Sequence, residues 1–363
     1  MKKNILVVDD SALMRRVICD IINTDSMFQA TDVCRDGREA YEQLKKKKYD
    51  GVILDVNMPR MDGLELLEKL KQDRIKATII VVSKLTTKDA KITMLAMERG
   101  AVDFVAKPDN VIEAKGAEFK KQVLEVLSAI IKHGNTDRFL NPIPKGKART
   151  MDTLKAKATP TGKKDPTRRG GKKLVALACS TGGPKSLQSV IPFLPQNMDA
   201  PMVLVQHMPK GFTKSMADRL DELSKVHVKE AEEGDILQKG WVYVAPGGKH
   251  MQVARTADGE HCIRLNDEPP IGGLRPCANI TYQSLKTSGF DEITCVVLTG
   301  MGADGTDGIQ ALKKRKALYV ISQDAQTCVV YGMPKALAEA GLVDEVVPLT
   351  EVAQSIIKNV GVR

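Results

Sequence analysis

Apolar strand patterns alternate with amphipathic helix patterns near the start of the chain, and this alternation limits the possible folds more than any other feature. Runs such as "NILVVDD" (4–10), "GVILDV" (51–56) and "ATIIVVS" (77–83) are separated by segments whose apolar residues recur every three to four positions. We count five such strands and five helices over residues 4–132. This order predicts a parallel, doubly wound sheet of the flavodoxin-like type.

The alternation resumes at Leu174 and continues to the end of the chain. "LVALA" (174–178), "MVLVQ" (202–206) and "ITCVVL" (293–298) read as buried strands. They predict a second, Rossmann-like α/β domain with some antiparallel strands in its middle. We therefore expect a first domain over residues 1–125, a linker over 126–172 and a second domain over 173–363.

The segment between the two domains carries nearly all of the net charge of +10. Residues 133–173 hold twelve Lys/Arg and three acids, a net +9, and are otherwise rich in Pro, Gly and Thr. This composition favours a flexible charged linker, although its edges could pack on a domain surface. A DNA-binding regulator fits poorly because the charge does not belong to a folded face, so we expect no nucleic-acid partner.

Cysteine usage and apolar run lengths indicate the compartment. Seven cysteines occur without a Cys-x-x-Cys pair, most of them in apolar strings, which is typical of reduced thiols in the cytosol. The opening "MKKNILVVDD" reads as a strand rather than a secretion signal. No apolar run approaches membrane-spanning length. We expect a cytoplasmic protein that does not insert into membranes.

Five polar residues stand at the ends of strands in the first domain, where a parallel sheet places its ligands: Asp9, Asp10, Asp55, Ser83 and Lys107. Three acids this close repel one another unless a cation neutralises them, and carboxylate oxygens suit Mg²⁺. A carboxylate beside Mg²⁺ and a lysine is placed to attack a phosphoryl group, and a hydroxyl can bind a phosphoryl oxygen. A single acid would more simply cap a helix, as Asp10–Ser11 could. All five at strand ends favour a site.

The motif series "VVDDS…LDVNMPRMDG…VVSKLT…VDFVAKP" resembles a response-regulator receiver domain across residues 1–125. The resemblance implies that Asp55 accepts phosphate from a histidine kinase and that Asp9 and Asp10 hold Mg²⁺ with it. It also implies that Lys107 contacts the phosphoryl group. Asn57, two residues after the acceptor, stands where related proteins often have an acid, so the lifetime of the phosphate is left open.

The stretch "LACSTGGPKSL" (177–187) joins a strand to a helix through a glycine-rich turn. Gly182 and Gly183 permit a sharp bend, and Pro184 suits a first helical turn. Free amides at a helix start stabilise an anion, which could be a bound phosphate or the oxyanion of a tetrahedral intermediate. The turn matches neither G-x-S-x-G nor a P-loop. Taken alone, it favours phosphate binding or a structural role over catalysis by Ser180.

Two distant strand ends change this interpretation. His207 ends the buried strand in "MVLVQHMP", and it is the only one of five histidines expected at the same sheet edge as Ser180. "ITCVVLTGMGADGTDG" (293–308) leads into a loop that holds Asp304, while Asp307 stands where we expect a helix N-cap. Ser180 would be the nucleophile, His207 its base and Asp304 the group that orients the imidazole.

"STGGP", "VQHMP" and "LTGMGADG" behind a receiver and a linker resemble the chemotaxis protein-glutamate methylesterases, the CheB family. The resemblance implies hydrolysis of glutamate γ-methyl esters on methyl-accepting chemotaxis receptors, with release of methanol, and deamidation of receptor glutamines. It adds Thr181 and Met301 to the active site, Thr181 near the oxyanion, although a methionine more often only packs. Hydrolysis needs no metal, and Mg²⁺ belongs to the receiver.

The same resemblance implies a chemotaxis histidine kinase as phosphodonor, and we expect a monomer. The unphosphorylated receiver should cover the Ser180 cleft, and phosphorylation of Asp55 should loosen it. Two positions depart from the family: Cys179, which we interpret as buried packing, and "RPCAN" (275–279), which leaves the support of the site open. The alternative is a non-enzymatic response regulator whose second domain binds a nucleotide or a protein.

Overall fold

The computed structural model describes residues 2–84, 86–108, 110–133 and 171–363. Within them the strands form three sheets of five, seven and two strands. The greater part of the predicted linker, residues 134–170, lies outside the described residues. No helix in the described part of the chain is long and apolar enough to cross a membrane.

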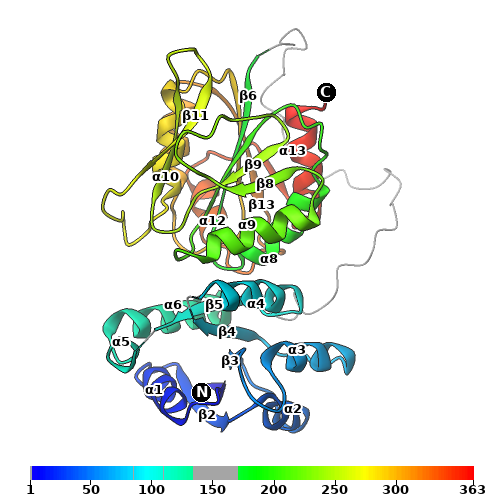
Figure 1. The fold of residues 1–363 in the computed structure, drawn as a ribbon, viewed down its shortest axis with the longest axis vertical. Helices are drawn as coiled ribbons and strands as arrows, with labels where there is room; N and C mark the ends of the chain where they lie inside the picture. Colours follow the sequence, from blue (N-terminus) through cyan, green and yellow to red (C-terminus); the bar gives the residue numbers. More distant parts are fainter. Residues whose placement is uncertain (1, 85, 109, 134–170) are drawn as a thin grey trace.

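The first sheet is parallel throughout, as predicted, with strand order β2-β1-β3-β4-β5 (Figure 1). Its strands are β1 (Lys3–Val8), β2 (Phe28–Cys34), β3 (Gly51–Asp55), β4 (Ile79–Lys84) and β5 (Asp103–Lys107). Successive residues of β1 point to opposite faces, so Ile5 and Val7 belong to one buried cluster and Leu6 and Val8 to another. Helices cover both faces of this sheet, and β5 is an edge strand because it ends the strand order.

Helices pack on both faces of this sheet. α1 (Ala12–Asn23) and α6 (Ala117–His133) cover Ile5 and Val7. The opposite face carries α2 (Gly37–Lys46), α3 (Gly63–Gln72) and α4 (Thr87–Glu98). The last of the five helices expected in this domain is divided into α5 (Val111–Ala114) and α6, because the chain turns at Gly116, whose N–H donates to the Glu113 carbonyl.

The second large sheet has the order β14-β13-β12-β6-β7-β9-β8, and each neighbouring pair is parallel. Its strands are β6 (Lys173–Cys179), β7 (Met202–Gln206), β8 (His227–Glu230), β9 (Trp241–Val244), β12 (Glu292–Val297), β13 (Ala317–Gln323) and β14 (Glu345–Val347). The antiparallel part that we predicted is the hairpin of β10 (His250–Arg255) and β11 (His261–Asn266). The sequence analysis missed β14, because three residues are too few to show a strand pattern.

Helices also cover both faces of this sheet. The apolar side chains of α8 (Gly183–Gln188), α9 (Phe212–Leu223) and α13 (Val352–Val360) join one buried cluster. Those of α10 (Ala278–Ser284), α11 (Thr306–Lys313) and α12 (Met333–Glu339) join another. Short 3-10 turns lie at Ile191–Phe193, Leu285–Thr287 and Leu349–Glu351. β6 and β7 therefore lie at the centre of a sheet that is covered on both sides.

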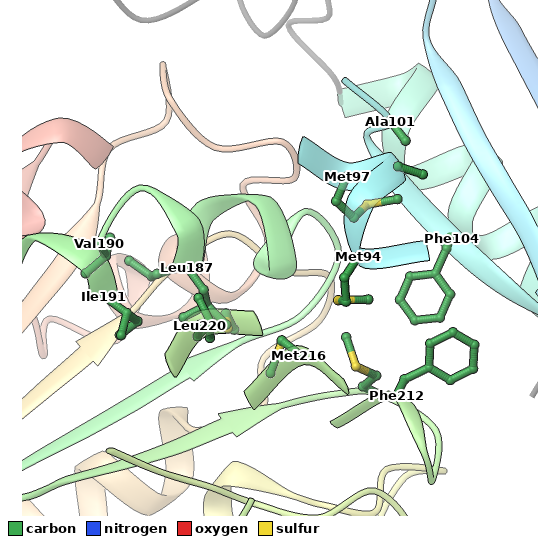
Figure 2. Packing of buried hydrophobic residues seen from close by; sticks show 14 of the residues in the cluster. Met94, Met97, Ala101, Phe104, Leu187, Val190, Ile191, Phe212, Met216 and Leu220 are labelled. Carbon is green, nitrogen blue, oxygen red and sulfur yellow. The ribbon is translucent and has the colours of Figure 1, made fainter. Parts of the chain in front are cut away.

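The two domains face each other through α4 and β5 on one side and α8 and α9 on the other (Figure 1). The rings of Phe104 and Phe212 stack with their centroids 4.6 Å apart. Met94 and Met97 of α4 lie beside Met216 of α9 in the same apolar cluster (Figure 2). This cluster runs from the receiver sheet into the second domain, so the interface has an apolar centre.

Candidate functional site

The acidic residues of the first domain converge as predicted. Carboxylate oxygens of Asp9, Asp10 and Asp55 all lie within 4.8 Å of one another. Lys107, at the end of β5, donates to Oδ2 of Asp9 and to Oδ2 of Asp55, each at 2.7 Å. Asp9, Asp55 and Lys107 are buried, whereas Asp10 is exposed. One edge of the sheet thus brings together three acids and one ammonium.

Negative charge exceeds positive charge in this cluster. Burial raises the pKa of Asp55, and the neighbouring Asp9 raises it further against the opposing effect of Lys107. Burial alone would lower the pKa of Lys107, but the charges of Asp55 and Asp9 outweigh it and raise that pKa. An excess of carboxylate is what a hard divalent cation compensates, so the donor set fits Mg²⁺.

The side chains of Ser83 and Asn57 both donate hydrogen bonds to Asp89, which lies in the first turn of α4. The Ser83 hydroxyl donates to the Asp89 carbonyl at 3.4 Å, and Asn57 Nδ2 donates to Asp89 Oδ1 at 2.6 Å. The backbone N–H of Asn57 donates to Asp55 Oδ1 at 3.3 Å. Asp89 therefore connects the sheet edge that holds Asp55 to α4. The sequence analysis overlooked it, although Thr86 and Asp89 show the spacing of a helix cap.

The turn after β6 has the geometry that its residues suggested. Gly182 adopts a φ of 76°, and Pro184 stands in the first turn of α8. A Cβ at Gly182 would lie 2.4 Å from the Val329 side chain, and one at Gly183 would lie 1.9 Å from Gln206 Oε1. Only glycine fits at these two positions, so the turn stays sharp and close to its neighbours.

Gln206, at the end of β7, ties the Ser180 turn to His207. Its Nε2 donates to the carbonyls of Ser180 and His207 at 3.1 and 3.0 Å. Its Oε1 accepts from the Cys179 thiol at 3.0 Å. Cys179 is buried, as expected, but it also holds this amide in place. A polar residue that ends a strand beside a candidate base was the available signal, and the sequence analysis passed over it.

His207 and Asp304 form a close pair. His207 Nε2 lies 2.8 Å from Asp304 Oδ2, and both side chains are nearly inaccessible to solvent. The backbone N–H of His207 donates to the Cys179 carbonyl at 3.2 Å, which places His207 beside the residue that precedes Ser180. The strand order β12-β6-β7 explains why these three strand ends meet. Within the described residues the Ser180 hydroxyl makes no hydrogen bond, so a direct bond from Ser180 to His207 is absent here.

The "RPCAN" segment (275–279), whose effect on the site was left open, binds Asp304. The N–H groups of Ala278 and Asn279 donate to its two oxygens at 2.6 and 3.0 Å, and the Cys277 thiol donates to Oδ1 at 3.2 Å. Burial would raise the pKa of Asp304, but the His207 ring and these N–H donors bring it down to about 2. The "RPCAN" segment therefore supports the aspartate chiefly through its backbone.

The expectation for Asp307 was wrong. The N-cap of α11 is Gly305, and Asp307 lies inside the first turn. Asn279 Oδ1 accepts from the N–H groups of Gly305 and Gly308 at 3.0 and 2.7 Å. A side chain from another helix thus takes the place of the local cap, which no local pattern could indicate.

Thr181 and Met301 lie in the two loops beside the pair. The Thr181 carbonyl accepts from the Thr299 hydroxyl at 2.9 Å, which fixes the turn against the end of β12. Met301 is 43% exposed and belongs to no buried cluster of the described residues. Met301 is therefore not a buried core residue, and its role at the site stays a prediction.

The fold and the two sites define a response regulator: a receiver domain joined to a second α/β domain with its own polar site. The family description "Response regulator receiver domain" matches residues 5–115, and "CheB methylesterase" matches residues 175–356. The chain belongs to the CheB methylesterase family. The alternative of a response regulator without an enzymatic output domain is not favoured by these matches.

Named relatives cover nearly the whole chain. The "Protein-glutamate methylesterase/protein-glutamine glutaminase 1" of Syntrophomonas wolfei is 40% identical over 98% of this chain and 99% of its own. The protein-glutamate methylesterase/protein-glutamine glutaminase of Pyrococcus horikoshii is 42% identical over 99% of this chain and 94% of its own. The crystal structure of the Thermotoga maritima CheB methylesterase catalytic domain, 42% identical, covers 52% of this chain and 99% of that one with a TM-score of 0.50.

Proposed function

We propose that this protein is a phosphorylation-regulated serine esterase that hydrolyses glutamate γ-methyl esters on methyl-accepting chemotaxis receptors. The observation that carries the proposal is the buried His207–Asp304 pair at the strand ends that flank Ser180. The names of the full-length relatives supply the substrate class. We assign residues 173–363 to the catalytic domain, 1–125 to the receiver and 126–172 to the linker.

In the proposed reaction Ser180 Oγ attacks the ester carbonyl while the imidazole of His207 takes its proton. Asp304 accepts at Nε2 of the ring, so the nitrogen that remains as the base is Nδ1. The proton then passes to the leaving methoxide, methanol departs and an acyl-Ser180 remains. Water, deprotonated by the same ring, hydrolyses the acyl group. A receptor glutamine would follow the same route with ammonia as the leaving group.

The oxyanion would form next to the turn that carries Thr181. Pro184 has no N–H and therefore cannot itself donate to the anion. The fixed turn at Thr181 and the exposed Met301 both border the position of the substrate. We assign Thr181 to the oxyanion region and Met301 to contact with the substrate.

The receiver would control this reaction from the other side of the interface. Asp55 would accept a phosphoryl group from a chemotaxis histidine kinase, and Asp9, Asp10 and Asp55 would hold Mg²⁺, which when bound neutralises charge on the phosphoryl oxygens. Lys107 and Ser83 would contact the same oxygens. Because α4 packs on α8 and Asp103 of β5 accepts from the Gly182 N–H, the docked receiver would restrict access to the Ser180 turn. Phosphorylation would loosen that docking.

The test is methanol release from methylated receptors. Ser180→Ala should lower the rate by at least about 10³-fold, because the attacking oxygen is lost. Ser189→Ala, at the other end of α8, serves as the matched control and should retain activity. Unchanged methanol release by Ser180→Ala would contradict the proposal.

A further inference from the structure

The interface between the domains contains a buried carboxyl group that the proposed reaction does not use. Asp103 opens β5 and is 6% exposed. Its Oδ1 accepts from the backbone N–H of Phe104 at 2.9 Å. Its Oδ2 accepts from the backbone N–H of Gly182 at 3.2 Å, across the domain boundary. A receiver side chain thus binds an amide two residues from Ser180.

Apolar side chains of both domains enclose this contact. Phe104, next to Asp103, stacks on Phe212. Val329 and Val330 of the second domain join the same buried cluster as Val102 and Val105 of the receiver. Two backbone N–H groups are therefore the partners of Asp103 among the described residues, and no cation is bonded to it. A buried carboxylate with so little compensation is costly.

We propose that Asp103 is a proton-sensitive latch that holds the receiver on the Ser180 turn while its carboxyl is protonated and weakens the docking once it ionises. The latch extends the regulatory part of the proposed function. It rests on the proposed function only for the effect of docking on esterase activity. It would add an input to domain opening that does not pass through Asp55.

Burial supports the latch by raising the pKa of Asp103 from 3.8 to about 7. The only opposing causes are the hydrogen bonds from Phe104 and Gly182, and no charged group contributes. The charged or titratable side chains on the surrounding elements are Lys107 of β5, Lys84 of β4, Lys88, Asp89, Lys91 and Glu98 of α4, Arg99 directly after α4, Lys185 of α8, Lys214, Asp218, Arg219, Asp221 and Glu222 of α9, and Asp324, Cys328 and Tyr331 of the loop after β13.

The direction of the pH effect follows from where the proton is held. In the separated domains Asp103 meets water and its pKa returns to the ordinary value near 4. The docked form therefore keeps its proton to a higher pH, so docking is strongest in acid and weakens as pH rises through about 7. For this shift, the docking constant should fall about tenfold between pH 6 and pH 8.

Hydrogen exchange of the peptide that contains Gly182 measures this docking in the full-length chain. Wild type and variants are compared at the same pH, so that the intrinsic exchange rate cancels. Relative to Asp103→Asn, wild-type protection should fall about tenfold from pH 6 to pH 8. Asp103→Ala has neither a titrating group nor an amide at this position. Like Asp103→Asn, it should therefore lack the pH dependence of the wild type, whatever the absolute strength of its docking. Asp258→Asn, an exposed carboxylate of the second domain, should behave as wild type.

Equal pH dependence in wild type and both Asp103 variants would overturn the latch, as would loss of the effect in Asp258→Asn. The exchange measurement does not depend on esterase activity. It can be repeated in Ser180→Ala, so failure of the latch and failure of the proposed reaction give different results.

Discussion

At the scale of single residues, Asp304 binds several groups of the second domain at once. It bonds to the His207 ring, two backbone N–H groups and one thiol, and its pKa lies at about 2. It therefore remains ionised throughout the neutral range. In the proposed reaction, a fixed negative charge beside Nε2 would set the tautomer of the ring and stabilise the imidazolium formed when His207 takes a proton.

Asp304→Asn should lower kcat for methanol release by about 10³-fold with little change in KM, because the charge that stabilises the imidazolium is lost. Asp307→Asn removes the same charge three residues away, in the first turn of α11, and should keep nearly full activity. Steady-state kinetics on methylated receptors provide the measurement. Equal losses in the two variants would show that Asp304 acts only through general electrostatics or stability.

At the scale of elements, α4 connects the two sites. Its first turn bonds through Asp89 to Asn57, two residues after Asp55, and its last turn contacts the second domain through Glu98, which accepts from Arg219 of α9 at 2.9 Å. Met94 and Met97 lie between these ends in the interface (Figure 2). In the proposed regulation, a change at Asp55 would act on α4, which contacts α8 and α9.

Asp89→Ala should leave phosphorylation of Asp55 intact but reduce activation by a phosphodonor. The substitution removes the bond from Asn57 to α4 and so weakens the coupling, by roughly 2-fold to 30-fold in the activation ratio. The phosphorylated fraction and methanol release are measured on the same samples. Asp20→Ala on α1, an exposed carboxylate far from α4, is the control. Full activation of Asp89→Ala would exclude this connection.

At the scale of the whole molecule, an apolar contact at the centre of the interface is flanked by a partly exposed ion pair. Phe104 and Phe212 are buried and stacked, whereas Arg219 and Glu98 are 29% and 25% exposed in their side chains. Buried aromatic area stabilises an interface by several kcal/mol at most, and a solvated ion pair by about 1 kcal/mol or less. The aromatic pair should therefore dominate docking.

Phe104→Ala should raise the activity of the unphosphorylated protein by roughly tenfold or more, while Arg219→Ala should raise it by less than about fivefold. Both are measured as methanol release without phosphodonor. Thermal unfolding of each variant shows whether the chain is still folded. A larger effect from Arg219→Ala would mean that the ion pair, and not the apolar centre, holds the domains together.

Sequence reasoning reached the features that repeat along the chain or follow from a parallel sheet. The strand ends placed Asp9, Asp55 and Lys107 at one edge, and Ser180, His207 and Asp304 at another, because parallel strands end on the same side. The residues that it missed act across folded segments. Gln206 bridges two strand ends, Asn279 caps a helix from outside it, and Asp103 meets Gly182 only when the domains dock. Only Gln206 offered a local signal, as a polar residue at the end of a buried strand, whereas the contacts of Asn279 and Asp103 join segments that no local pattern connects.

The central claim is that Ser180 is a nucleophile whose exposure the receiver controls. A fluorophosphonate probe tests it in the full-length protein, because such a probe reacts with an activated serine. We expect labelling at Ser180 that is slow without phosphodonor and faster with it, and no labelling of Ser180→Ala. Labelling at another residue, or a rate that phosphodonor leaves unchanged, would contradict the account.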